Sequence, residues 1–444
     1  MRRLSLLLDL ARPAQLRAAL HVNRVSGTLG GAVRCGLSVA AALAALALAG
    51  RHDLAGFATL GALASLYGRA AGYPWRARLM VLAALSLTAT VAVTSAVVTL
   101  GAPVSVEIVV LALLAAVATA GTALLRTGPP GAIIIVFAAG AGTGTAASGL
   151  PQLLERAGAT AVGAALAVVI CCAGAVLRRR GRWIDVAPGR VSSVAPGTGP
   201  TTAPDVGPAG AASAVPAAPA RPGATAARQQ VPAARPARAR RPDPRGILDA
   251  LRTAPPLRSV AASALLVGTA TLLAAGAAAL AGRGHPAWAA MGATAVLQGA
   301  HVQHMGVRAI QRATGTACGV ALAFPLLGAD LGFTATAVTV VVLQVVTEVV
   351  VARHYGLAML TITPMALLMT TLGADADPSA LVLDRAVDTA IGALVGVLAA
   401  VAASRPDGSP AGSTTAPGTR PAPTPLAPAA GQRPATGACT SAGR

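Results

Sequence analysis

Long apolar runs, separated by short polar breaks, fill residues 31–177 and 258–403 of the chain. Most runs approach the ~20 residues that an α-helix needs to cross a bilayer. Because backbone polar groups inside a bilayer must be bonded within the protein, these runs predict helices. The first half has six segments, at about 31–49, 54–68, 79–100, 104–125, 130–149 and 157–177, and the second half has six more, at about 258–281, 286–302, 309–328, 332–351, 355–373 and 386–403.

The residues between and beyond these halves have a different composition. Residues 178–256 form a Pro/Ala/Gly/Thr tract with clustered arginine and almost no large apolar side chain. Such a tract cannot bury enough surface to offset its ordering entropy, so it predicts a disordered cytoplasmic linker. Contact of its arginines with anionic lipid is a second role that this composition allows. Residues 1–30 predict a cytoplasmic N-terminal segment, and residues 404–444 predict a disordered cytoplasmic tail.

Three sequence blocks of the first half recur in the same order in the second half, about 230 residues later. Repetition in one order at nearly one offset predicts a duplicated unit. The predicted fold is an all-α polytopic membrane protein of two parallel six-helix repeats, 31–177 and 257–403, with about twelve transmembrane helices. The recurring blocks are Leu48-Ala-Gly-Arg51 with Leu280-Ala-Gly-Arg283, Phe57–Gly68 with Trp288–Gly299, and Arg156-x-x-x-Thr160-x-x-Gly163 with Arg385-x-x-x-Thr389-x-x-Gly392.

Composition and charge support this class and set an orientation. The chain is 55% hydrophobic and 11% charged, whereas a soluble domain carries about 25% charged residues. Its net charge of +20 comes from arginines that gather in alternate loops. Since cytoplasmic loops are rich in arginine, both termini and the linker are predicted to be cytoplasmic. Nucleic acid is not an expected partner, because the sequence has no folded basic domain with stacking aromatics.

The sequence has no hydrolase triad, phosphate loop or metal-ligand cluster. We therefore expect no enzyme activity, cofactor or metal. The informative residues are instead ionisable groups within apolar spans, where charge is costly. Arg308, Arg312 and Thr316 share one helix face and form the leading cationic site, because a guanidinium fork matches a carboxylate. The alternative is that both arginines anchor the inner end of a helix.

Two acidic residues are candidates for proton exchange. Glu348 lies in a valine-rich span, where it either carries a proton or pairs with Arg353 near the inner interface. Asp388 follows Arg385 by three residues. The two form either a gate or substrate contact, in which Arg385 binds the substrate, or a local helix pair at the outer boundary. The first-half copy has Ala159 in place of Asp388.

For other polar residues of the second half, the sequence leaves two roles open. Tyr355 and Thr363 either contact a ligand or pack within their span, and His301 and His304 either sense pH or are ordinary loop residues.

The second half contains a set of motifs: His285-Pro-x-Trp288, Gln298, Arg308-x-x-x-Arg312-x-x-Gly315-Thr316-x-x-Gly319, Tyr355 with Thr363, and Arg385-x-x-Asp388-Thr389-x-x-Gly392. Through these residues it resembles the fusaric acid resistance (FUSC-type) family, which is grouped with aromatic acid exporters. The resemblance implies a bacterial plasma-membrane protein that exports organic or aromatic acids with the proton gradient. A related group of plant anion channels suggests passive organic-anion flux as an alternative, and a membrane scaffold without transport is a third. Expected partners are the bilayer and a small organic anion, with self-association into a homo-oligomer left open.

Overall fold

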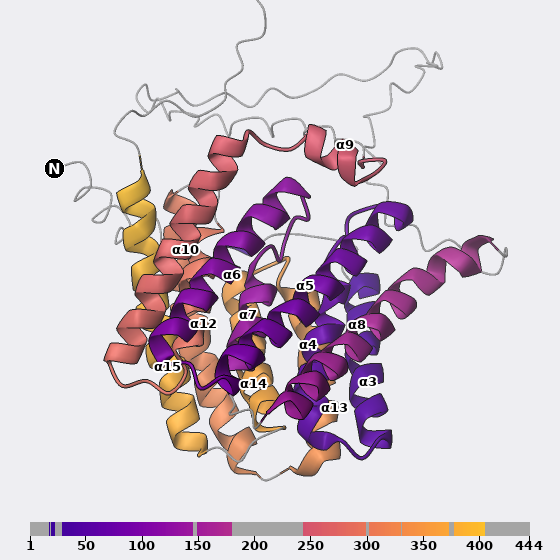
Figure 1. Cartoon of the computed structure of the whole chain (residues 1–444). Helices are drawn as coiled ribbons and strands as arrows, with labels where there is room; N and C mark the ends of the chain where they lie inside the picture. Colours follow the sequence, from indigo (N-terminus) through magenta and orange to yellow (C-terminus); the bar gives the residue numbers. More distant parts are fainter. Residues whose placement is uncertain are drawn as a thin grey trace, which may run out of the picture. The chain divides into compact units, whose positions relative to one another are not determined.

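The computed structural model describes residues 17, 19–22, 29–144, 149–179, 243–298, 302–329, 331–372 and 377–404. Regular structure within these residues is entirely helical (Figure 1), which confirms the predicted all-α class. The first half contains α3 (Leu29–Leu48), η1 (His52–Leu54), α4 (Ala55–Ala62), η2 (Leu63–Leu66), α5 (Tyr73–Thr99), α6 (Val104–Leu124), α7 (Ile133–Thr143) and α8 (Leu150–Arg179). After these come α9 (Ile247–Arg252), α10 (Leu257–Leu280), α11 (Pro286–Leu297), α12 (Val302–Gly328), α13 (Gly332–Val350), α14 (Tyr355–Thr371) and α15 (Pro378–Ala403).

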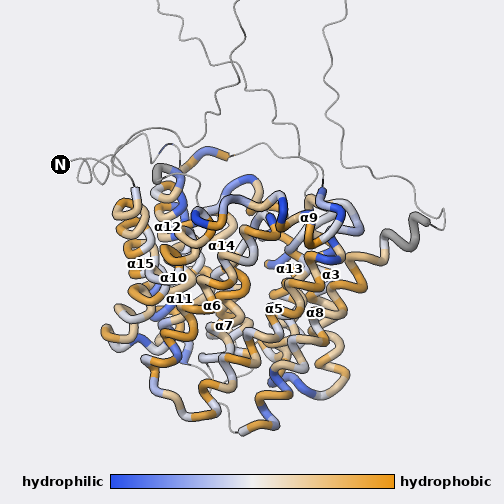
Figure 2. The backbone as a smooth tube through the Cα atoms, turned by 45° about the horizontal axis from the view of Figure 1, so that its top comes forward, coloured by the Kyte–Doolittle hydropathy of each residue, from blue (hydrophilic) through white to orange (hydrophobic). Residues whose placement is uncertain are grey.

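Seven described helices are long and apolar enough to cross a membrane: α3, α5, α6, α8, α10, α13 and α15. Large aliphatic side chains on them are exposed, such as Leu85 at 63%, Val117 at 68% and Leu265 at 71%. Lipid covers such surface in a membrane, and hydrophilic residues gather at the helix ends (Figure 2). The chain is therefore a multi-pass membrane protein. Each of the twelve predicted segments overlaps a helix. However, α4, α7, α11 and α14 are shorter than the seven, and α12 is not apolar enough to be among them, so twelve crossings in two repeats stay a prediction.

The short helices α4 and α11 are buried by the longer ones. Nearly all residues of α4 are buried, as are all residues of α11 after Pro286. A helix that is apolar on every side belongs in the interior, where small residues let its neighbours approach. After α4 the chain leaves the α-helix through η2 and reaches the buried Tyr67, whose hydroxyl donates to the Gly131 carbonyl at 2.8 Å. Irregular backbone at this depth is tolerated because protein surrounds it.

The same set of helix contacts occurs in both halves. In the first half α8 packs against α4 and α5, and α5 also packs against α7. In the second half α15 packs against α11 and α12, and α12 also packs against α14. Between the halves, α6 packs against α10 and α3 packs against α13. Helices that are far apart in sequence thus lie side by side at two equivalent places.

Glycines bring the most closely packed of these helices together. A Cβ at Gly163 of α8 would lie 1.8 Å from the carbonyl oxygen of Ala58 in α4. A Cβ at Gly392 of α15 would lie 2.2 Å from the carbonyl oxygen of Ala289 in α11. Only glycine permits backbones this close. Both contacts join residues that correspond in the recurring sequence blocks.

The ends of the predicted linker differ from the structure. Helix α8 continues through Arg179, and α9 lies within the segment 178–256 that was predicted to be disordered. Ala250 of α9 is buried against Trp75 and Leu79 of α5, and this contact offsets the ordering entropy of the short helix. The prediction for residues 180–242 lies outside the described residues, as do the predictions for most of residues 1–30 and for residues 405–444.

Candidate functional site

Six polar side chains are buried together in the second half, on α12, α14 and α15. Each is between 0% and 2% exposed. A bilayer offers no water to such groups, so charge and hydroxyl here are costly and point to function. We call this set the central polar cluster: Arg312, Thr316, Thr363, Arg385, Asp388 and Thr389.

Close packing of α12 and α14 positions Arg312. A Cβ at Gly315 would lie 2.3 Å from the Gly356 carbonyl oxygen, so the two helices almost touch there. At this crossing Arg312 Nη1 donates to the Tyr355 hydroxyl at 3.0 Å. Arg308, one turn earlier on the same face, lies over the Tyr355 ring at 4.4 Å. Arg308 and Arg312 thus lie on one helix face, as their spacing predicts, and both contact Tyr355, which the sequence did not predict.

Arg385 reaches the cluster from the opposite direction. It follows the start of α15 by seven residues, or about 10 Å along the helix, whereas Arg312 follows the start of α12 by ten residues, or about 15 Å. Because α12 and α15 begin at opposite ends of the bundle, the two guanidinium groups approach the interior from both sides. Arg385 lies over the Trp288 ring at 5.3 Å and interacts electrostatically with Arg312, Tyr355 and Asp388.

Many polar atoms of the cluster have no hydrogen-bond partner among the described residues. They include Nε and Nη2 of Arg312, and Nε and Nη1 of Arg385. The other atoms without a partner are both carboxylate oxygens of Asp388 and the hydroxyls of Thr316, Thr363 and Thr389. Buried polar groups are almost always satisfied in proteins, so these groups are suited to bind a polar ligand. Two guanidinium groups supply the planar donors that a carboxylate accepts.

Glu348 lies outside the central polar cluster. It is 4% exposed and forms an ion pair with Arg69, which follows η2 in the first half. Gln344 donates to its other carboxylate oxygen at 3.4 Å. Arg353, which one interpretation of the sequence made its partner, instead donates to the Val349 carbonyl at 2.7 Å. The carboxylate of Glu348 therefore connects the two halves.

Two loop histidines, His301 and His304, were singled out in the sequence. His301 lies outside the described residues. His304 is exposed at the start of α12. In the described part of the chain, no group of three or more His, Cys, Asp and Glu side chains could hold a metal ion.

The first half repeats part of this arrangement. Arg156 lies over the Phe57 ring at 5.3 Å, as Arg385 lies over Trp288. Near these arginines, Arg51 bonds to Glu155 at 2.6 Å and Arg283 bonds to Asp384 at 3.2 Å. Our sequence reasoning identified neither these ion pairs nor the two arginine–aromatic contacts. The recurring blocks could have predicted the ion pairs. Arg51 aligns with Arg283, and an acidic residue, Glu155 or Asp384, comes directly before each of the aligned arginines Arg156 and Arg385.

A comparison with family models finds one match in the second half. Residues 272–399 match the family described as fusaric acid resistance protein-like. We call these residues the FUSC-like domain. The match includes every residue of the central polar cluster and confirms the resemblance noted in the sequence. A match to this family suggests a membrane transport or resistance protein. No curated protein and no solved structure matches the chain.

Proposed function

We propose that this protein exports organic or aromatic acids across a bacterial plasma membrane, driven by the proton gradient. One observation carries the proposal. Two arginines, Arg312 and Arg385, are buried in the FUSC-like domain close enough to interact electrostatically, and each has N–H groups without a partner among the described residues. A buried cation that lacks a partner is strongly destabilising, and a bound carboxylate would compensate it through short charge-assisted hydrogen bonds.

The substrate carboxylate binds between these two guanidinium groups in our proposal. Arg308 and Tyr355 hold Arg312 in position from the inner side, through the ring contact and the 3.0 Å hydrogen bond. Thr316 and Thr363 offer hydroxyl groups to the rest of the ligand. Because α12 and α15 begin at opposite ends of the bundle, a ligand between Arg312 and Arg385 can be reached from either side when the helices shift.

Asp388 is the proposed proton carrier. It lies one helical turn from Arg385, and both its carboxylate oxygens are unbonded within the described residues. Protonation of Asp388 leaves the cluster more positive, which favours a bound anion, and loss of the proton disfavours it. Glu348 is the second candidate, although its ion pair with Arg69 favours a role in holding the two halves together.

The architecture that we propose has two parallel six-helix repeats with both termini in the cytoplasm. The recurring helix contacts and the paired ion pairs of the two halves support duplication. The position of arginine in alternate loops supports the orientation.

A passive organic-anion channel is the second candidate function. The excess of arginine over acid in the cluster favours it, since a channel needs a cationic lining but no titratable residue. Collapse of the proton gradient separates the two. Uphill export should stop, whereas downhill anion flux should persist. A scaffold without transport would show neither.

The proposal is tested at Arg312 in a strain that lacks the native protein. Arg312→Lys keeps the charge but not the planar fork, so it should impair export of an aromatic acid, and Arg312→Ala should impair it more. Arg258→Lys, at an exposed position in the first turn of α10, is the matched control and should export normally. Membrane abundance is measured in parallel. Full export by Arg312→Lys at normal abundance would leave Arg312 as a helix anchor, because either cation serves at an interface.

A further inference from the structure

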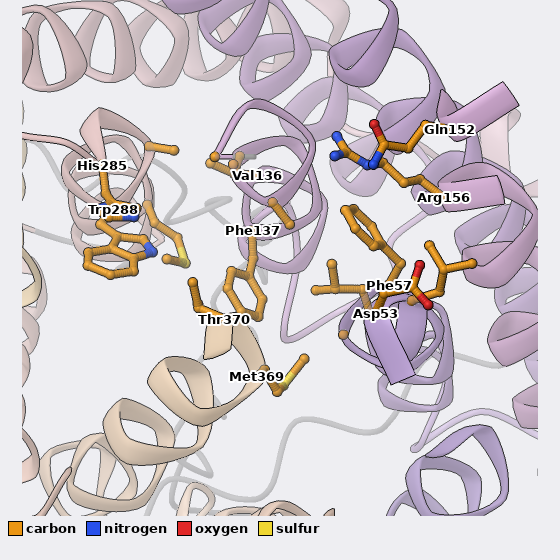
Figure 3. Close-up of a pocket in the computed structure, with 18 residues that line it drawn as sticks. Asp53, Phe57, Val136, Phe137, Gln152, Arg156, His285, Trp288, Met369 and Thr370 are labelled. Carbon is orange, nitrogen blue, oxygen red and sulfur yellow. The ribbon is translucent and has the colours of Figure 1, made fainter. Parts of the chain in front are cut away.

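One pocket of the described helices lies between the two halves, with Trp288 on one side and Arg156 on the opposite side (Figure 3). Both side chains already have partners within the protein. The Trp288 ring is stacked on His285 at 4.3 Å and lies under Arg385 at 5.3 Å. Arg156 lies over the Phe57 ring. A different opening, of about 310 Å³, lies between α5 and α6, and we call it the α5–α6 groove.

The α5–α6 groove exists because α6 packs mainly against α10, whereas α5 packs against α7 and α8. A Cβ at Gly268 of α10 would lie 3.0 Å from the Ala116 Cβ of α6, so these two helices are close. Space is left on the other side of α6. Val93 and Val117, which line this space, are 44% and 68% exposed. Lipid covers such surface in a membrane, so the groove opens toward acyl chains.

The lining of the groove is mostly apolar. Leucine, valine, alanine and isoleucine side chains make up most of it. Three of its hydroxyl groups donate to backbone carbonyl oxygens: Ser86 to Leu82 at 2.8 Å, Thr122 to Ala118 at 2.7 Å and Tyr67 to Gly131 at 2.8 Å. An apolar cavity of ~150 Å³ holds benzene, so the groove, with about twice that volume, takes on the order of a dozen carbon atoms. Its chemistry and volume suit a hydrocarbon chain.

The length of the groove matches one leaflet of a bilayer. Its lining residues along α6 run from Leu114, in the middle of the helix, to Leu125 at its end. This distance is about 16 Å at the rise of an α-helix. The hydrocarbon of one leaflet is ~15 Å deep, which is half of the bilayer core. An acyl chain in the groove would therefore place its headgroup at the Leu125 end.

Arg126, at this end of the groove, occupies a backbone position that favours glycine. Its φ is +52°, and it is the one residue other than glycine with a positive φ in the described part of the chain. Helix α6 ends there with two hydrogen bonds, from the Arg126 N–H and from the N–H that follows, to carbonyls three and five residues earlier. The same two hydrogen bonds end α3, α5 and α10, where the left-handed residues are Gly50, Gly101 and Gly282.

A side chain in this left-handed conformation costs free energy that glycine avoids. An arginine in this position therefore needs a compensating role. Interaction with the dipole of α6 is one such role, and binding of an anion is another. Arg126 is exposed and lies between Leu125 and Thr127, which both line the groove. Its charge thus adjoins the end of an apolar groove.

We propose that the α5–α6 groove binds an anionic phospholipid, with one acyl chain between α5 and α6 and the phosphate on Arg126. Basic residues at the ends of transmembrane helices attract anionic headgroups, and the groove adds a fixed place for the chain. The site lies outside the central polar cluster. Its test measures lipid binding alone, so it does not depend on the proposed function.

The test compares two lipids that differ only in the headgroup. The full chain is purified in detergent micelles and titrated with dioleoyl phosphatidylglycerol, which is anionic, or with dioleoyl phosphatidylcholine, which has no net charge. Native mass spectrometry counts the bound lipid. Phosphatidylglycerol should bind about tenfold more tightly, as a charge-assisted hydrogen bond implies. Glycerophosphoglycerol, which has the headgroup but no chains, should bind more weakly than either lipid.

Three variants separate the parts of the site. Arg126→Gly removes the charge and the left-handed side chain, so it should fold at least as stably and lose the preference for phosphatidylglycerol. A Cβ at Gly121, which lines the groove, would have nothing within 4 Å. Gly121→Leu should therefore fold, fill the groove and weaken both lipids by about tenfold or more. Arg258→Gln, in the first turn of α10 and away from the groove, is the matched control and should bind like the parent.

Equal affinity of the parent for the two lipids overturns the proposal, as does an unchanged phosphatidylglycerol preference in Arg126→Gly. Unchanged lipid binding in Gly121→Leu would place the lipid on another surface and equally overturn it, and this variant decides if Arg126→Gly does not fold. Glycerophosphoglycerol that binds as tightly as the lipid would make Arg126 a site for soluble anions and overturn the role of the groove. Loss of the preference in Arg258→Gln would show an effect of general surface charge.

Discussion

Substitution of one glycine should destabilise the first half strongly, whereas a neighbouring glycine on the same helix should tolerate it. A Cβ at Gly163 would lie 1.8 Å from the Ala58 carbonyl oxygen, where ordinary contact begins at 3.4 Å, so α8 and α4 must separate by roughly 1.6 Å. Overpacking of this kind costs about 1–3 kcal/mol. Gly158 has nothing within 4 Å of a Cβ. There alanine should be neutral or gain up to about 1 kcal/mol in helix propensity.

The difference between Gly163→Ala and Gly158→Ala in free energy of unfolding should therefore be about 1–4 kcal/mol. Reversible unfolding in mixed detergent micelles measures it, with helical content by circular dichroism as the signal. Gly392→Ala should behave like Gly163→Ala, because its Cβ would lie 2.2 Å from the Ala289 carbonyl oxygen. Stabilities of Gly163→Ala and Gly158→Ala that agree within about 0.5 kcal/mol, the usual range for inert surface changes, would refute the packing argument.

Two further predictions concern a helix cap and the topology. Hydrogen bonds from the Ser379 hydroxyl and from the backbone N–H groups of Ser379 and Ala380 hold the pKa of Asp377 below its ordinary value. Stability from this cap is present above the unfolded pKa and is lost as pH falls through the folded pKa. Asp377→Asn should remove that part of the acid dependence of the melting temperature, and an unchanged pH profile would contradict the assignment. In a variant whose native cysteines are replaced, Pro103→Cys should be labelled from outside intact cells and Gly199→Cys only after lysis. External labelling at residue 199 would reverse the proposed orientation.

The positions of the helices could be predicted because a long apolar segment lies in the bilayer, where its backbone N–H and C=O groups must bond to one another within a helix. All twelve predicted segments overlap a helix in the structure. The lengths of α4 and α11 were harder to predict, because runs of alanine and glycine look the same whether lipid or protein surrounds them. The order in α9 also escaped prediction. Its burial of Ala250 against Trp75 and Leu79 joins residues about 170 positions apart, which no local pattern records.

The candidate site was predictable to the extent that its residues share a helix. Arg308 and Arg312 are one turn apart, and the sequence alone places them on one face. The contact of Arg385 with Trp288 and the pairing of Glu348 with Arg69 connect different helices. For Glu348 the sequence supported Arg353 as a partner, because it lies only five residues away. In the structure Glu348 pairs with Arg69 instead, because helix packing brings Arg69 to the carboxylate although the two residues are far apart in sequence.

Both halves contain a buried arginine stacked on an aromatic ring, and they differ in whether a carboxylate lies one helical turn away. In each half an arginine near the start of a long helix is buried against an aromatic ring, Arg156 on Phe57 and Arg385 on Trp288. Stacking on a ring lowers the cost of burying a guanidinium without consuming its in-plane donors. In the second half Asp388 adds a carboxylate one turn away, whereas the first half has Ala159 at that position. A buried carboxylate next to a buried arginine can exchange a proton as it releases an anion. In the proposed exporter, the presence of Asp388 in one half and Ala159 in the other therefore assigns proton coupling to the second half.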